Sequence, residues 1–115
     1  MIVRTHPGWE LTIYTGPDPY DIDNGNVDVE VAFVDGRRFG ATFFTLRNIQ
    51  KQMEQDRISG ESGGGQYFSC RDLVVVRNLA PATIESAVEA MIHEDSIDEI
   101  LLALEDVLGD LPGAS

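Results

Sequence analysis

The sequence VDVEVAFVDGRRFGATF, residues 27–43, decides the fold. Large apolar side chains alternate in it with Asp28 and Glu30, which is the two-residue period of a strand with one buried face. Asp35-Gly36 interrupts the alternation and is a frequent pair in tight turns between strands. The stretch therefore predicts a β-hairpin with one apolar face, while the two carboxylates lie on the other face.

The length of the turn determines which residues of the two strands face each other. A two-residue loop would pair a core side chain with Arg38, whereas a three-residue loop over 34–36 keeps every large side chain on one face. The longer loop also gives Gly36 the left-handed position that a type I turn with a bulge requires. We therefore expect it, with three facing pairs: Val31 with Phe39, Val29 with Ala41 and Val27 with Phe43.

Two further segments have the character of strands. Residues 9–14, WELTIY, alternate as the hairpin does. Residues 67–70 and 73–76, YFSC and LVVV, are either two short strands that turn at Arg71-Asp72 or one long strand with a bulge. The run LVVV favours a central place in the sheet, covered on both faces.

A helix is expected between the hairpin and these later strands. Thr45 can cap it, and it should end before Ser59-Gly60. Its apolar stripe consists of Leu46, Ile49 and Met53. The glycine-rich segment 60–65 that follows is expected to be the most flexible part of the chain.

Two more helices should complete the chain. Pro81 suits the opening turn of the first, whose apolar residues follow helical spacing. Ser96 and Glu99 form the capping box of the second, which should end near Gly109. Two residues widen the apolar arc of this last helix, Leu102 and Val107. The width predicts contact with a second surface, either the sheet or another chain.

The order of these elements predicts the fold class. Strands grouped ahead of helices are typical of α+β proteins. We expect a single α+β domain over 1–115, with an antiparallel sheet of four to five strands, in the order β-β-β-α-β-β-α-α, and helices packed on it.

The charge is large and unevenly placed. The formal net charge is −12, and residues 80–115 hold nine Asp or Glu and no Lys or Arg. Such a field repels the phosphates of nucleic acids and anionic lipids, and it attracts basic partners. The same acids can also serve simply as solvated helix faces. We expect no nucleic-acid binding and no membrane binding, and a basic protein partner is possible.

The chain also lacks the marks of export or membrane insertion. No apolar run approaches the roughly 20 residues that a membrane helix needs. The opening residues MIVRTHPGWE lack the apolar core of a signal peptide, and one cysteine excludes an internal disulfide. These features predict a cytoplasmic protein.

Tests for metal, phosphate and nucleophile motifs fail. Counted from Asp21, a calcium loop would need an acid at Gly25 and a glycine at Asn26. The glycine cluster has no lysine and leads into a strand, unlike a phosphate loop. Cys70 shares a predicted face with Phe68 and is expected to be buried. His6, beside Pro7, is expected to be exposed, whereas His93 should lie near a helix end. We expect no catalytic residues, no metal and no cofactor.

Two groups of residues are candidates for binding a partner. Glu61, Tyr67, Arg71 and Asp72 flank the glycine segment. The first three are the binding candidates, since Tyr and Arg are frequent in interface hot spots. The second group lies on the predicted last helix and consists of Asp98, Glu99, Glu105 and Asp106. Arg37 and Arg38 of the hairpin are expected to be intramolecular partners of nearby acids.

Residues 41–92 carry a familiar pattern. ATFFT at 41–45 precedes a helix with Asn48-Ile49, a glycine segment follows, and DLVVV at 72–76 leads into another helix. The pattern resembles a group of small uncharacterised bacterial proteins associated with toxin–immunity loci. The resemblance covers under half of the chain. It implies a stand-alone bacterial domain of unknown activity, for which an immunity role is one candidate, and no functional residues are carried over.

Together these features predict a non-enzymatic acidic protein-binding domain. An immunity-type inhibitor of a basic bacterial toxin is one concrete form. The alternatives are a homodimeric assembly module, formed through the last helix, or a small-molecule binder at the glycine segment.

Overall fold

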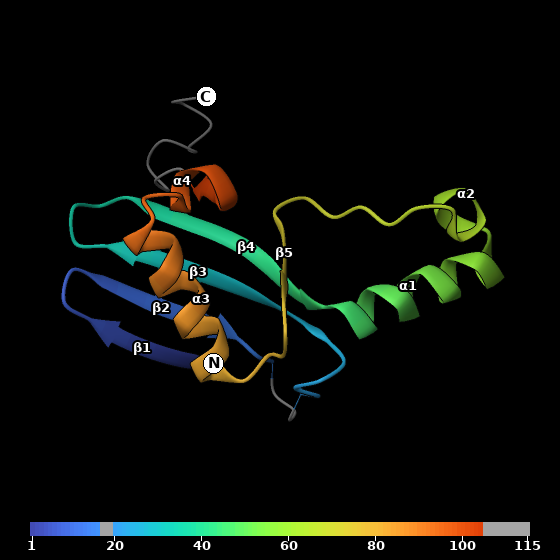
Figure 1. Cartoon of the computed structure of the whole chain (residues 1–115), viewed down its shortest axis with the longest axis horizontal. Helices are drawn as coiled ribbons and strands as arrows, with labels where there is room; N and C mark the ends of the chain where they lie inside the picture. Colours follow the sequence, from blue (N-terminus) through green and yellow to red (C-terminus); the bar gives the residue numbers. More distant parts are fainter. Residues whose placement is uncertain (17–19, 105–115) are drawn as a thin grey trace, which may run out of the picture.

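The computed structural model describes residues 1–16 and 20–104 and has an α+β fold, as predicted (Figure 1). Five strands follow one another across the sheet in the order β1-β2-β3-β4-β5, and β6 pairs with β4. The elements are β1 (Ile2–His6), β2 (Trp9–Tyr14), β3 (Asn26–Phe33), β4 (Arg38–Thr45), α1 (Leu46–Ser59), α2 (Glu61–Gly65), β5 (Leu73–Val76), α3 (Pro81–His93), α4 (Ile97–Ile100) and β6 (Leu102–Leu104).

The central hairpin has the predicted three-residue turn. Val31 faces Phe39, and the two other expected pairs also form. The Phe33 amide donates to the Arg37 carbonyl at 2.8 Å, and Gly36 has a φ of 98°. The alternation of apolar residues was therefore sufficient to predict the register between β3 and β4.

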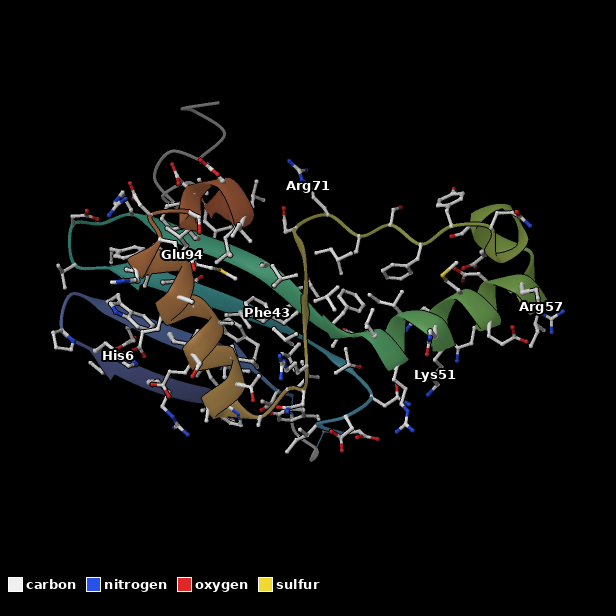
Figure 2. All side chains as sticks on the ribbon, in the orientation of Figure 1. His6, Phe43, Lys51, Arg57, Arg71 and Glu94 are labelled. Carbon is white, nitrogen blue, oxygen red and sulfur yellow. The ribbon has the colours of Figure 1, made fainter. Side chains whose placement is uncertain are left out.

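One face of the sheet and helices α3 and α4 enclose the core. Phe43, labelled in Figure 2, is fully buried in it. The core residues of α3 are Ile84, Val88 and Met91, and α4 and the residue after it add Ile97 and Leu101. Helix α3 begins at Pro81 as predicted and crosses the strands in Figure 1. Helix α3 packs on the core face of the sheet and leaves the opposite face uncovered by this helix.

The sheet contains more strands than the sequence indicated. Strand β1 forms an antiparallel edge beside β2, with Ile2 facing Ile13 and His6 facing Trp9. Its core side carries Arg4 and His6 in place of apolar residues, so the alternation that identified the other strands is missing. The pair β4–β5 is parallel, whereas the four other pairings are antiparallel.

The segment before β5 differs from both alternatives. Residues 67–70 form no strand, and pairing with β4 begins only where Leu73 faces Thr42. Strand β5 lies at an end of the main strand order and not at its centre, and Val75 is 45% exposed. The apolar run was therefore a poor guide to position in the sheet.

The predicted last helix is wrong beyond its first turn. Helix α4 ends at Ile100, Leu101 is extended, and β6 pairs with β4 so that Leu104 faces Arg38. No side-chain cap hydrogen bond forms at Ser96. Strand β5 pairs only with the later part of β4, so the earlier part of that edge can bond the chain as β6. Val107 and the predicted end at Gly109 lie outside the described residues.

Helix α1 is capped as predicted but is not buried. Thr45 Oγ1 accepts from the Asn48 amide at 3.2 Å, and Gly60 ends the helix. Of the predicted apolar stripe, Leu46 is 65% exposed, and Ile49 and Met53 are half-buried. Figure 1 shows α1 projecting away from the strands. Residues 46–72, which leave the sheet with α1 and return to it at β5, are called the arm below.

The glycine segment forms a compact left-handed turn at the far end of the arm. Residues 62–65 all have positive φ. A Cβ on Gly65 would lie 2.6 Å from the Met53 carbonyl oxygen, so this glycine allows the turn to pack against α1. The segment is therefore a defined part of the arm and not an open loop.

Candidate functional site

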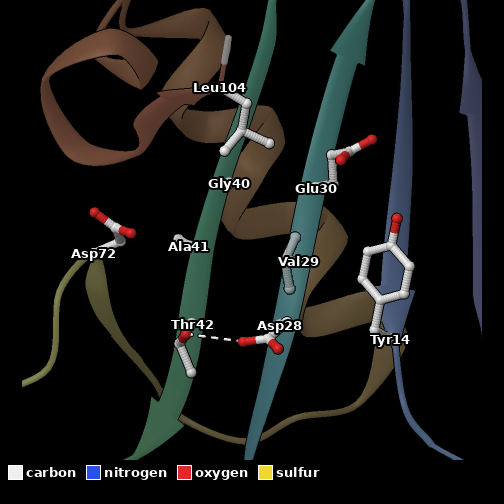
Figure 3. A pocket seen from close by; sticks show the side chains of 9 residues that line it. All are labelled: Tyr14, Asp28, Val29, Glu30, Gly40, Ala41, Thr42, Asp72 and Leu104. Carbon is white, nitrogen blue, oxygen red and sulfur yellow. Dashed lines mark hydrogen bonds between the residues drawn. The ribbon is translucent and has the colours of Figure 1, made fainter. Parts of the chain in front are cut away.

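The sheet has one face that the helices leave accessible, called the open face below. Alternation in β2, β3 and β4 places on it the residues between the core positions. Figure 3 views this face with the helices behind the strands. Its polar residues are Glu10, Thr12, Tyr14, Asp28, Glu30, Arg38 and Thr42.

A shallow hollow of about 230 Å³ lies on the open face. It is called the acidic hollow below. The side chain of Leu104 passes over Gly40, where a Cβ would lie 3.2 Å from it, and so supplies an apolar wall. The lining residues are Tyr14, Asp28, Val29, Glu30, Gly40, Ala41, Thr42, Asp72 and Leu104 (Figure 3).

The carboxylates of the hollow come from β3 and from the residue that precedes β5. Asp28 and Glu30 are two residues apart on β3, and Asp72 precedes β5 with a φ of 62°. Thr42 Oγ1 donates to Asp28 at 2.9 Å. Arg38 Nη2 donates to Glu30 at 2.7 Å. These bonds hold two of the carboxylates in place.

The open face has an excess of negative charge. The lining contains three carboxylates and no basic side chain, and Glu10 adds a fourth carboxylate to the same face. Arg38 is the neighbouring cation, and it forms an ion pair with Glu30. Carboxylates at an accessible surface accept strong hydrogen bonds from ammonium and guanidinium groups. The geometry therefore suits cationic side chains.

Reactive groups lie away from the hollow. Its lining contains no His, Cys or Ser. Over residues 1–16 and 20–104, no group of three or more His, Cys, Asp or Glu is placed to hold a metal ion. In the same residues, no helix is long and apolar enough to cross a membrane. The carboxylates of the hollow can accept hydrogen bonds from a bound donor.

The three predicted residues of the glycine segment lie on the arm. Glu61, Tyr67 and Arg71 are exposed, and Tyr67 is 55% exposed. Phe68 and Cys70 are half-buried, so the predicted alternation holds although no strand forms. None of the three lines the hollow, but Asp72, the next residue after Arg71, does.

The predicted acidic surface at the end of the chain is only partly described. Asp98 and Glu99 are exposed on α4, which packs with the core side of the sheet. Glu105 and Asp106 lie outside the described residues. The structure therefore does not bring Asp98 and Glu99 into the hollow.

The two hairpin arginines are intramolecular partners, as expected. Arg37 Nε donates to Asp35 at 2.8 Å, and Arg38 pairs with Glu30. The pKa of Asp35 is lowered, first by the backbone N–H of Arg37 and then by its guanidinium.

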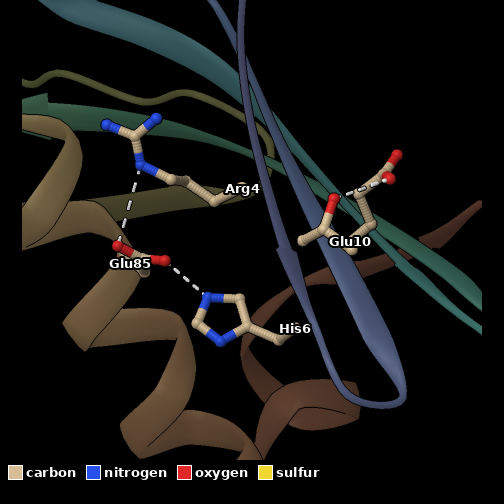
Figure 4. A network of polar contacts seen from close by, with 5 residues as sticks. Arg4, His6, Glu10 and Glu85 are labelled. Carbon is tan, nitrogen blue, oxygen red and sulfur yellow. Dashed lines mark hydrogen bonds and ion pairs between the residues drawn. The ribbon is translucent and has the colours of Figure 1, made fainter.

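The prediction that His6 is exposed is wrong. The ring is half-buried and stacks on Trp9, with 4.0 Å between the ring centroids. It also contacts the carboxylate of Glu85 on α3 (Figure 4). Arg4 Nε lies 3.9 Å from the same carboxylate. This contact could not be predicted, because β1 lacks the apolar alternation that marks a strand. The network joins the edge strand to the helix layer.

Cys70 and His93, the two other residues tested for reactive chemistry, also lie away from the hollow. Cys70 is half-buried instead of fully buried, and its Sγ donates to the Arg71 carbonyl at 3.4 Å. It lies in unpaired chain, so no neighbouring strand covers it. His93 lies in the last turn of α3, as predicted, and is exposed.

The chain matches no family model, no curated protein and no solved structure in three comparisons with known proteins. Of the open-face residues, Asp28 and Glu30 could be found from alternation alone. Asp72 was expected beside the glycine segment, but its place in the hollow, like that of Leu104, depends on tertiary pairing.

Proposed function

We propose that this chain is a non-enzymatic binding domain whose open face binds a basic surface of a partner protein. The observation that supports it is the excess of carboxylates around the acidic hollow, on a face that no helix of the described chain covers. The partner is a protein that presents Lys or Arg side chains to this face.

The hollow offers both parts of a site for a long cationic side chain. Asp28 and Asp72 supply acceptors for the charged head. Leu104 and the ring of Tyr14 supply apolar area for the methylene stem, and an aromatic ring also attracts a cation. A lysine or arginine can therefore bury its stem and keep its charge paired.

The charge of the whole chain favours fast encounter with such a partner. A net charge of −12 steers a basic protein toward the domain, and salt screens the attraction. The association rate is expected to fall steeply as salt is added. An immunity-type inhibitor that neutralises a cationic toxin in the cytoplasm is one concrete form of this function.

Peptide binding by matched variants tests the proposal. The probe is a fluorescent peptide rich in lysine and arginine, and each variant removes two negative charges. D28N/D72N changes the hollow, E89Q/E94Q changes exposed residues on or beside α3, and D98N/E99Q changes α4. Asn tolerates the left-handed backbone at Asp72, so the fold should be kept.

The hollow variant is expected to bind the peptide about tenfold more weakly, and the α3 variant less than about twofold. A loss confined to D98N/E99Q would move the site to the terminal acids that the sequence indicated. Equal losses in all three variants would mean that net charge alone attracts the peptide, and the proposal would fail.

A further inference from the structure

Helix α1 is exposed to an unusual degree for an element of a folded domain. Of its 14 residues, the one fully buried is Asn48, a polar residue. Leu46 is 65% exposed and Ile58 is 75% exposed. Helices in proteins gain most of their stability from packing an apolar face. Helix α1 therefore has apolar surface that a second surface can cover.

The same helix carries two cations without an ion-pair partner in the described part of the chain. Arg47 and Lys51 are four residues apart and exposed, so they lie on one face of α1. Figure 2 shows Lys51 pointing away from residues 66–72. Arg57, in contrast, pairs with Glu54 at 2.6 Å. The first half of α1 thus presents a small basic patch.

The net charge is separated between the arm and the rest of the chain. Residues 46–72 contain four Lys or Arg and four Asp or Glu, so the arm is neutral. The remaining residues contain four basic and sixteen acidic side chains, so they carry the whole net charge of −12. The arm is therefore the part of the chain that an acidic surface repels least.

We propose that α1 of one copy docks on the open face of a second copy, with Arg47 and Lys51 over the carboxylates of β3. The inference rests on the proposed function, because it names the basic partner as another copy of this chain. Two copies can exchange arms in this way around a twofold axis.

The dimensions of the two surfaces agree. Helix α1 is about 21 Å long, and β3, with 8 residues, is about 27 Å long. Arg47 and Lys51 are separated by about 6 Å along the helix axis. Asp28 and Glu30 are separated by about 7 Å along their strand. Two cations can therefore meet two carboxylates in register.

The arm cannot make this contact with its own sheet. Helix α1 starts directly after β4 at the Thr45 cap. Its first turn is held by Asn48, whose Oδ1 accepts from Asn26 at 2.9 Å and whose amide donates to Asn24 at 3.4 Å. These contacts direct the helix away from the strands, so the open face of another copy is the surface it can reach.

Charge reversal tests the docking. R47E/K51E reverses the charge of the basic patch on α1. E10K/D28K reverses the charge of two carboxylates on the open face and leaves the ion pair of Glu30 with Arg38 intact. By sedimentation, the wild type should form a dimer at high concentration, and each variant should associate at least about tenfold more weakly. An equimolar mixture of the two variants should form a heterodimer. All four positions are exposed, and circular dichroism checks that each variant folds.

The matched control is E89K/E94K, which changes the net charge as much as E10K/D28K does and should keep the dimer. A wild type that stays monomeric at every soluble concentration would overturn this inference. So would a dimer that persists in both reversal variants. Neither result affects the proposed function, which fails separately if the hollow variant binds the basic peptide as well as the wild type does.

Discussion

His6 shows how one side chain can join two layers of this fold. Its ring stacks on Trp9 and contacts Glu85 of α3. We predict that H6A lowers the free energy of unfolding by about 1–2 kcal/mol, because a stacked pair and a charge-assisted hydrogen bond are both lost. V3A, at an exposed position on the same strand, should cost less than about 0.5 kcal/mol.

Urea unfolding measures this difference, and Trp9 is the one tryptophan of the chain, so its fluorescence reports the transition. Equal midpoints for H6A and V3A would contradict the role given to His6.

Asp35 in the hairpin turn titrates below its ordinary pKa. The first cause is the backbone N–H of Arg37, which a side-chain substitution retains. We predict that R37A raises the pKa of Asp35 only part of the way to its ordinary value. NMR titration of the carboxyl measures it, and a complete return would mean that the guanidinium is the main cause.

The sign of the pH effect follows from the direction of this shift. Because the folded-state pKa of Asp35 is lowered, its interaction stabilises the fold above the unfolded pKa. The contribution is lost as pH falls through the folded-state pKa. Asp35 is fully exposed, so the effect on stability is small.

At the scale of elements, the left-handed turn of the arm depends most on Gly65. An alanine there brings a Cβ within 2.6 Å of the Met53 carbonyl oxygen, whereas the same change at Gly64 meets nothing within 4 Å. Both residues have positive φ, so the backbone strain of about 1 kcal/mol is common to both variants. We predict that G65A loosens the arm far more than G64A does.

Amide hydrogen exchange in the second half of α1 measures this loosening, since it reports local opening. Exchange should be faster in G65A than in G64A. Similar exchange in the two variants would contradict the packing of the turn on the helix.

The elements that could be predicted are those whose local pattern and tertiary environment agree. The central hairpin is one, because alternation and the turn residues both required the same register. The last helix is the opposite case, because it was expected to continue beyond α4. Residues 102–104 have helical spacing in the sequence, but they pair with the free edge of β4 as a strand. Strand β1 carries Arg4 and His6 on its core side, so no pattern marked it.

At the scale of the whole molecule, the open face exists because α1 does not cover it. The connection from β4 to β5 joins parallel strands, and such a connection commonly packs its helix on the sheet. Here the first turn of the helix is held at Asn48, and the arm projects instead. The sequence placed Asp28 and Glu30 opposite the core, but it could not predict that this face would stay accessible.

The central claim is that the acidic hollow binds a basic protein surface. Its most direct test is an NMR titration of the amides of the whole chain with a peptide rich in lysine and arginine. The largest shifts are expected at residues 28–30, 40–42 and 72, which line the hollow. Shifts centred on residues 98 and 99, or spread evenly over the acidic surface, would contradict it.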